Sequence, residues 1–161
     1  MKLVRLSKSN RAAMTKIALI CFGKKYTEKE IKKWYGKRLD GSYKETDKVL
    51  EYFLALEKSK PVGITGFFNL NKGRKVFWLG YFGVIPSKRK RGLGSKILAK
   101  TIEMAKKKGA KRFSLWGSVK KAEEFYNRNG FRKIKGMKAI IENGKVIYKF
   151  PKNTYFYSKR V

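Results

Sequence analysis

The chain contains no histidine and a single cysteine, Cys21, among its 161 residues. One cysteine cannot form an internal disulfide, and without histidine the usual ligand set of a zinc or copper site is missing. The same absences exclude a Ser-His-Asp triad and a Cys-His pair as the source of nucleophilic catalysis. A lone thiol is typical of a reducing compartment, so we expect a cytoplasmic protein that binds no metal.

Long hydrophobic runs are also absent. The longest, near residues 17–22, is far shorter than the roughly 20 apolar residues of a membrane-spanning helix. Residues 1–5 lack the apolar stretch of a secretory signal. Apolar residues nevertheless make up 42% of the chain, which is enough for one core. We therefore expect residues 1–161 to form a single domain without membrane insertion.

Acidic residues are scarce. The chain has 11 Asp and Glu against 42 Lys and Arg, and its formal net charge is +31. Lysine-rich thermophilic proteins usually pair lysine with glutamate in ion-pair networks, and here the partners are too few. A basic protein of this kind favours polyanionic partners such as RNA or the ribosome, although a genome-wide lysine bias would produce the same surface.

Hydrophobic periodicity, turn residues and helix caps divide the chain into short elements. The pattern predicts the order β-α-α-β-β-β-α-β-α-β-β, an α/β (α+β) domain whose mixed, mostly antiparallel central sheet is flanked by helices. The predicted elements cover about 2–6, 9–22, 27–38, 49–56, 62–70, 76–85, 92–108, 111–116 and 119–129, then β pattern from 131 with a hairpin turn at Asn143-Gly144 and a closing strand at 154–159. Thr27 and Glu30 form a capping box at the start of the second helix.

Residues 84–95 lie where a predicted strand, stopped by Pro86, gives way to a helix. A helix N-terminus presents unpaired N–H groups that suit phosphate. Gly92 and Gly94 lack the Cβ atoms that would hold an anion away from the backbone, and residues 88–91 add four positive charges. The spacing fits neither a Walker loop nor the dinucleotide fingerprint. Alone, this short pattern also fits a solvated basic turn.

Two motifs flank the next helix and strand, and together they are specific. They read Arg89-x-x-Gly92-x-Gly94 and Ala122-x-x-Phe125-Tyr126-x-x-x-Gly130-Phe131. In this order, over roughly residues 78–136, the chain resembles the GNAT superfamily of N-acetyltransferases. The resemblance implies a GNAT-like fold and an acyltransferase that uses acetyl-coenzyme A (acetyl-CoA) as cosubstrate.

The resemblance also implies roles for individual residues. The backbone of Gly83, Val84 and Ile85 would pair with the pantetheine arm as an added strand does. Backbone N–H groups and local charge would hold the diphosphate, from Arg89, Lys90, Arg91, Gly92, Leu93, Gly94, Ser95 and Lys96. Tyr126 would be the general acid that protonates the departing thiolate, since a phenol with a pKa near 10 can donate to a thiolate whose acid has a pKa of about 8.5.

The sequence departs from the family pattern in two places. Relatives often have an asparagine seven residues before the tyrosine, where this chain has Val119, so Ser118 is the substitute helix cap and cofactor contact. Many relatives carry a glutamate base on the strand before the phosphate loop, but no Asp or Glu occurs in residues 58–101. The nearest candidate base is Glu51 on an adjacent strand, unless it lies on the solvent face of that strand.

The missing carboxylates also constrain the acceptor. Positive surroundings lower the pKa of an amine, and an α-amine starts near 7.7–8.0 whereas a lysine starts at about 10.4. We expect direct attack by a primary α-amine, of a protein N-terminus or an aminoacyl group, on a ribosome- or RNA-associated acceptor. The alternative is a basic RNA- or ribosome-binding module on a catalytically weak GNAT scaffold. Acyl-chain length and oligomeric state stay open.

Overall fold

The computed structural model describes residues 1–23, 28–42, 49–69, 75–117, 122–142, 145–150 and 152–161. Its elements, in chain order, are β1 (Lys2–Arg5), α1 (Arg11–Phe22), α2 (Glu28–Asp40), β2 (Leu50–Glu57), β3 (Lys60–Asn69), β4 (Val76–Val84), the 3-10 turn η2 (Pro86–Lys88), α3 (Leu93–Lys107), β5 (Arg112–Gly117), α4 (Glu123–Arg128), β6 (Arg132–Ile134), β7 (Ala139–Glu142), β8 (Lys145–Lys149) and β9 (Tyr155–Arg160). The predicted order is confirmed as far as α4. After α4, where the predicted order has two strands, the described residues form four.

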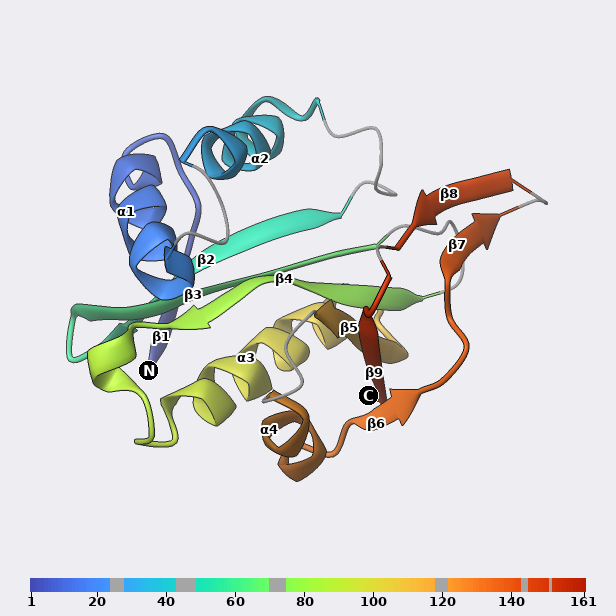
Figure 1. Cartoon of the computed structure of the whole chain (residues 1–161). Helices are drawn as coiled ribbons and strands as arrows, with labels where there is room; N and C mark the ends of the chain where they lie inside the picture. The colour runs from blue at the N-terminus through green and yellow to red at the C-terminus, as the bar shows by residue number, and fades with distance from the viewer. Residues whose placement is uncertain (24–27, 43–48, 70–74, 118–121, 143–144, 151) are drawn as a thin grey trace.

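The described strands form a seven-stranded sheet in the order β1-β2-β3-β4-β5-β9-β6. Neighbours are antiparallel except for the parallel pair β4 and β5. That pair is parallel because α3 carries the chain back along the sheet between the two strands. The helices α1 and α2 lie on one face, and α3 and α4 lie on the other (Figure 1). A mostly antiparallel sheet flanked by helices is the fold class that the pattern predicts.

The strands β7 and β8 form a separate two-stranded sheet. Their pairing confirms the predicted hairpin, although the turn itself, Asn143-Gly144, lies outside the described residues. The predicted capping residue Thr27 also lies outside them. Because the hairpin leaves the main sheet, the closing strand β9 is free to insert between β5 and β6.

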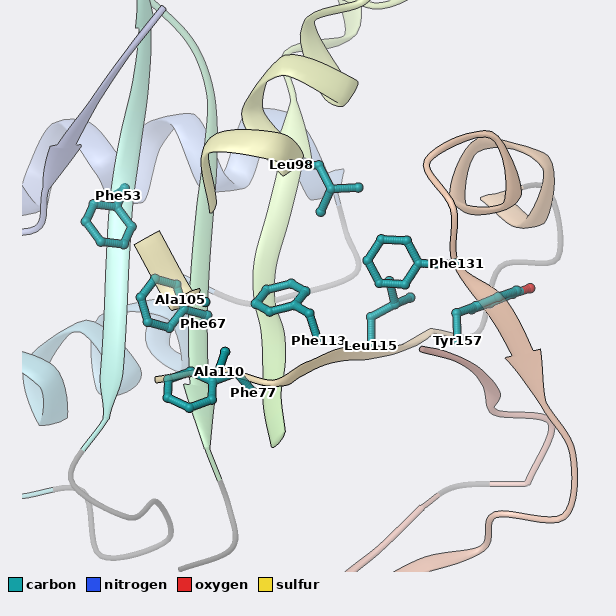
Figure 2. Packing of buried hydrophobic residues seen from close by; sticks show 10 residues of the cluster. All are labelled: Phe53, Phe67, Phe77, Leu98, Ala105, Ala110, Phe113, Leu115, Phe131 and Tyr157. Atoms are coloured by element: carbon teal, nitrogen blue, oxygen red, sulfur yellow. The ribbon is translucent and has the colours of Figure 1, made fainter. Parts of the chain in front are cut away.

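The sheet is buried on both faces, because successive side chains of a strand point to opposite sides. Three pairs of adjacent residues place one side chain in the cluster on each face: Phe77 and Trp78, Leu115 and Trp116, and Tyr157 and Phe156. Towards α3, one cluster joins Leu98 and Ala105 of the helix to aromatic side chains from several strands (Figure 2). Towards α1 and α2, Tyr35 of α2 lies with Tyr52 of β2 in a second cluster. The domain therefore has a core on each side of one sheet.

Gly63 of β3 pairs with Val84 at the end of β4, where the backbones of the two strands lie close together. A Cβ added there would lie 2.3 Å from the carbonyl oxygen of Gly83 on β4. The close contact is with backbone, which cannot rotate away as a flexible side chain can. Glycine at position 63 thus permits the pairing of β3 with the C-terminal end of β4, where the candidate site residues begin.

We expect Gly63→Ala to lower the free energy of unfolding by about 1–3 kcal/mol, because the added methyl group has to displace the β4 backbone. Chemical denaturation measures this loss. Gly117→Ala in β5 is the matched control, since a Cβ there meets nothing within 4 Å. Equal stability of the two variants would show that β3 and β4 can separate at no cost.

Candidate functional site

The central strands β4 and β5 pair only over a short stretch. Their partners are Val76 with Arg112, Phe77 with Phe113 and Trp78 with Ser114. On its other side β5 pairs with β9 from Arg112 to Gly117, and beyond Trp78 the strand β4 continues beside β3 alone. Within the described residues, no strand pairs with this side of β4 from 79 to 84. The edge therefore offers backbone N–H and C=O groups to an extended ligand, in the middle of a sheet.

A bulge in β4 accompanies this divergence. The register between β3 and β4 shifts between Ile64 and Gly66, whose partners on β4 are Gly83 and Gly80. The extra residue of β4 lies beside Tyr81, which has a φ of 38°, in the left-handed region that most side chains avoid. A bulge bends its strand and increases the local twist. This bend separates the end of β4 from β5.

The residues predicted to meet the pantetheine arm lie just after the bulge. Gly83 pairs with Ile64 and lies under α1, where an added Cβ would be 2.7 Å from the Cβ of Cys21. The carbonyl of Val84 accepts a hydrogen bond from the Arg89 side chain, and the N–H of Ile85 donates to β3. Some backbone groups of this segment are therefore already hydrogen-bonded within the protein. The unpaired edge of β4 also includes the residues that precede this segment.

The loop after β4 leads directly into the N-terminus of α3. Gly92 caps the helix in the left-handed conformation, with a φ of 71°, and Lys90 has a φ of 60°. The first intrahelical bond runs from the N–H of Lys96 to the carbonyl of Gly92. By helix geometry, the N–H groups of residues 93–95 then lack an acceptor within the helix. These N–H groups lie at the end of α3 that adjoins the basic loop, and this combination of donors and positive charge suits phosphate.

The side chains of this segment divide into two groups. Leu93 is 2% exposed and packs in the core, so only its backbone faces the loop. Lys90, Arg91 and Lys96 are exposed. The exposed side chains can approach an anion at the helix N-terminus, while the buried leucine fixes the first turn of α3 against the sheet.

Arg89 is used differently from its basic neighbours. Its Nε donates to the carbonyl of Val84 at 3.0 Å, and its Nη2 donates to the carbonyl of Cys21 at 3.0 Å. The second acceptor belongs to the last turn of α1, where a cation is favourable against the helix dipole. The guanidinium thus joins the ends of β4 and α1, and its predicted contact with the diphosphate stays a prediction.

The two sequence motifs meet in the structure. A Cβ on Gly94 would lie 3.1 Å from Cε2 of Phe125, so the α4 ring packs directly on the first turn of α3. The ring of Phe125 also stacks on Phe82 of β4, with centroids 5.9 Å apart. Phe82 was not among the residues predicted for the site, since a phenylalanine in a strand pattern reads as core. These contacts hold α4 beside the open edge of β4.

Tyr126 follows Phe125 on α4 and lies against the core on the α3 side of the sheet. Its ring contacts Tyr157 and Phe131, with centroids 5.4 Å and 5.9 Å away. Burial, with a smaller contribution from Tyr157, raises the pKa of Tyr126 to about 12. The phenol therefore keeps its proton throughout the physiological pH range and is available as a hydrogen-bond or proton donor there.

Glu51, the candidate base, lies in a buried ion-pair cluster. Its residue is 6% exposed, and Oε2 lies 3.0 Å from Nη2 of Arg38 and 3.3 Å from Nε of Arg5. The carboxylate joins β1, β2 and the end of α2. The alternative that Glu51 lies on the solvent face of its strand is therefore wrong. Within the described residues, the Glu51 carboxylate is therefore engaged by two guanidinium groups and connects three elements of the fold.

Other predicted chemistry can be checked against the described residues. Ser118 and Val119 lie outside them. The lone thiol, Cys21, is buried, and burial raises its pKa to about 11, so it is not a nucleophile at neutral pH. Within the described part of the chain, no three potential metal-ligating side chains come together. None of the described helices has the length and apolar character needed to cross a membrane.

A family model for the acetyltransferase (GNAT) family matches residues 11–131. The chain therefore belongs to the GNAT family, as its motifs predict. It is also similar to an uncharacterized N-acetyltransferase of Methanocaldococcus jannaschii, with 34% identity over 127 residues. The matched region is 73% of this chain and 54% of that protein, so the chain spans about half the length of this relative.

Solved structures share the fold at low sequence identity. A GNAT-family protein from Desulfovibrio desulfuricans has a TM-score of 0.73 and 15% identity, with 99% of this chain and 98% of that one covered. The PaiA N-acetyltransferase of Thermoplasma acidophilum, solved in complex with coenzyme A, has a TM-score of 0.67 and 16% identity, with coverage of 99% and 98%. The GNAT-like fold is thereby confirmed over the length of this chain.

We expect Arg89→Ala to lower the free energy of unfolding by about 1–2 kcal/mol, because two carbonyls lose a charged donor. Arg91→Ala is the matched control, since it removes an exposed arginine from the same loop and should change stability by less than about 0.5 kcal/mol. Urea denaturation compares the two. A loss of stability in Arg91→Ala alone would contradict the division of roles described above.

Proposed function

We propose that this protein is an N-acetyltransferase that binds acetyl-CoA and transfers its acetyl group to a primary amine. One observation carries the proposal: the open edge of β4 leads, through a basic loop, into the N-terminus of α3. An extended chain of amides that ends in a diphosphate fits both halves of this surface, and pantetheine diphosphate has that form. The coenzyme A complex of the PaiA N-acetyltransferase, which shares the fold, supports the same ligand class.

Coenzyme A would be held mainly by backbone. The amides of the pantetheine arm would pair with the β4 edge near the bulge, as an added strand does. The diphosphate would accept from the N–H groups of residues 93–95, with Lys90, Arg91 and Lys96 supplying positive charge. Gly92 would leave the backbone accessible to the phosphate, since the space around its missing Cβ is open, whereas the missing Cβ of Gly94 makes room for the Phe125 ring.

The transfer would proceed by direct attack of a neutral amine on the thioester carbonyl. The C–N bond forms, the carbonyl oxygen becomes an oxyanion that a β4 N–H group can stabilise, and the C–S bond then breaks. The amine loses one proton, and the leaving thiolate gains one. Coenzyme A supplies the activated acetyl group, while the chain supplies orientation and the donors.

Tyr126 would donate to the sulfur as the C–S bond breaks. Its pKa of about 12 exceeds the value of about 8.5 for an alkyl thiol, so complete transfer before bond breaking is unfavourable. The proton would move late, and the proton released by the amine would restore the phenol. The net transfer is then from amine to thiolate, and no charged phenolate accumulates in the buried site.

The acceptor we propose is an α-amine, at a protein N-terminus or on an aminoacyl group, carried by a ribosome or RNA. The ion pairs of Glu51 and the absence of Asp and Glu from residues 58–101 support an amine that needs no strong base. An α-amine is partly neutral at pH 7, whereas a lysine amine is almost fully protonated. The net charge of +31 supports an anionic carrier over a free polycation.

The alternative is a basic RNA-binding module on a scaffold with little catalysis. Base stacking by such a module needs exposed aromatic rings. In the described residues, the aromatic side chains gather instead in the core clusters on the two faces of the sheet. The presence of Tyr126 at the motif position next to Phe125, whose ring stacks on Phe82 of β4, also supports the enzyme. Measurable acetyl-CoA turnover with an amine separates the two readings.

We expect Tyr126→Phe to lower kcat by about 100-fold or more with little change in KM for acetyl-CoA, because only the donor to the leaving group is lost. The sign of the pH effect follows from the raised pKa. Since the phenol stays protonated below about pH 12, its ionisation should cause no loss of wild-type rate between pH 8 and pH 11. Tyr155→Phe is the control, and unchanged turnover of Tyr126→Phe at every pH would exclude this donor.

Acetyl-CoA hydrolysis and transfer with a panel of amines tests the acceptor. N-terminal peptides and aminoacyl-RNA should be acetylated faster than spermidine or a lysine side chain, because the chain lacks a carboxylate base and repels polycations. A colorimetric assay of released thiol gives the rates. Faster acetylation of spermidine would overturn the proposed acceptor but leave the acetyl-CoA site intact.

A further inference from the structure

The β7–β8 hairpin is an arm attached to the main sheet at one place. In the described part of the chain, β7 and β8 pair only with each other, and the hairpin extends away from the body beyond the sheet (Figure 1). Phe150 anchors its base, with ring centroids 4.5 Å from Phe156 and 5.0 Å from Trp116. The N–H of Phe150 donates to the carbonyl of Lys138 at 3.0 Å, which closes the two strands at the anchor.

The chain around this arm is almost purely cationic. Between residues 125 and 161 the sole acidic residue is Glu142. The basic residues of the same segment are Arg128, Arg132, Lys133, Lys135, Lys138, Lys145, Lys149, Lys152, Lys159 and Arg160. The imbalance is stronger here than over the whole chain, and the segment comprises the hairpin together with the elements that flank it, α4, β6 and β9.

Four lysines at the arm are exposed and carry their charge outward. They are Lys135, Lys138, Lys149 and Lys152. Among the described residues, none of the ion pairs involves these four, whereas Arg128 and Lys133 nearby are paired with Glu124 and Glu123. We call the four residues the arm lysines. Their charge has no partner among the described carboxylates, which leaves it available to a polyanion.

We propose that the arm lysines form a docking surface for the phosphate backbone of RNA. The arm lysines lie at or next to the base of the hairpin, where Lys149 ends β8 and Lys138 immediately precedes β7, and each contact of this group with a phosphate releases a condensed counterion. The nearby aromatic rings are engaged elsewhere, because Phe150 is buried and Lys133 covers the ring of Tyr155. Binding is therefore through charge and independent of base sequence.

An acidic lipid surface is the rival polyanion, and the structure favours RNA over it. Peripheral membrane binding combines basic charge with apolar side chains that enter the interface. Among the described residues, the exposed large apolar side chains are Ile20 on α1 and Val146 on β8. These two residues lie on different elements and form no patch among the described side chains, whereas the four arm lysines are all exposed.

The arm also lies away from the proposed coenzyme A site. The loop at η2 and the N-terminus of α3 are at one end of the molecule, and the arm is at the other (Figure 1). RNA on the arm would leave the cofactor site accessible, so both ligands can bind together. This inference rests on the proposed function only in giving RNA the role of acceptor carrier, since docking itself requires no acetyl transfer.

The test compares two variants with the same change in charge. One replaces the arm lysines by serine, and the control replaces the exposed Lys8, Lys16, Lys29 and Lys33 by serine. Fluorescence anisotropy with a short labelled single-stranded RNA is measured over a salt series. At about 0.15 M salt we expect the arm variant to bind at least about tenfold more weakly than the control. Its slope of log affinity against log salt should fall by about 3, as four lost phosphate contacts predict.

Equal weakening of the two variants would overturn the proposal and attribute RNA binding to a uniformly basic surface. Loss of binding to phosphatidylserine vesicles in the arm variant, with RNA binding retained, would assign the arm to membranes instead. Acetylation of a short peptide, measured in parallel, separates this inference from the proposed function. If neither variant nor the wild type acetylates any amine, the enzyme proposal fails while the RNA comparison still decides the role of the arm.

Discussion

The separation of β4 from β5 is the constraint on which the rest of the site depends. Sheets normally satisfy their backbone by pairing, and an unpaired edge in the centre of one is costly unless something completes it. Here the bulge at Tyr81 turns β4 away after Trp78, and α1 covers the bulged segment through the close approach of Gly83 to Cys21. The fold therefore keeps open a position that an extended ligand can complete.

The same divergence explains why two motifs far apart in sequence belong together. Gly94 lies in the first turn of α3 and Phe125 of α4 packs on it, so this contact joins the basic loop to the helix that carries Tyr126. Phe82 completes the arrangement from β4. A bulkier residue at position 94 would separate α4 from the strand, which moves Tyr126 relative to the β4 edge. A short glycine motif and an aromatic pair thus act as parts of one structural unit.

Much of the fold could be predicted because it is determined by local sequence signals. Turn residues and periodicity define the β2–β3 hairpin and α3, and the order of motifs identifies the family. The contacts of Arg89 and Glu51 could not be predicted, because their partners lie on elements far away in sequence: Cys21 for the first, Arg5 and Arg38 for the second. Periodicity shows that a charged residue occurs in a loop or strand, but the partner that it meets depends on tertiary packing.

Electrostatics then separates binding from chemistry within the site. The cations of the loop and the N–H groups of α3 suit a ligand that is already charged, and they need no change of protonation to act. Around Tyr126 the reverse holds, since burial keeps the phenol neutral and makes a phenolate unfavourable. In the proposed transfer, β4 offers no carboxylate to accept the amine proton, so that proton would pass to the leaving sulfur. An acceptor with an intrinsically low pKa would satisfy this requirement, and the excess positive charge of the protein would lower that pKa further while attracting the proposed anionic carrier.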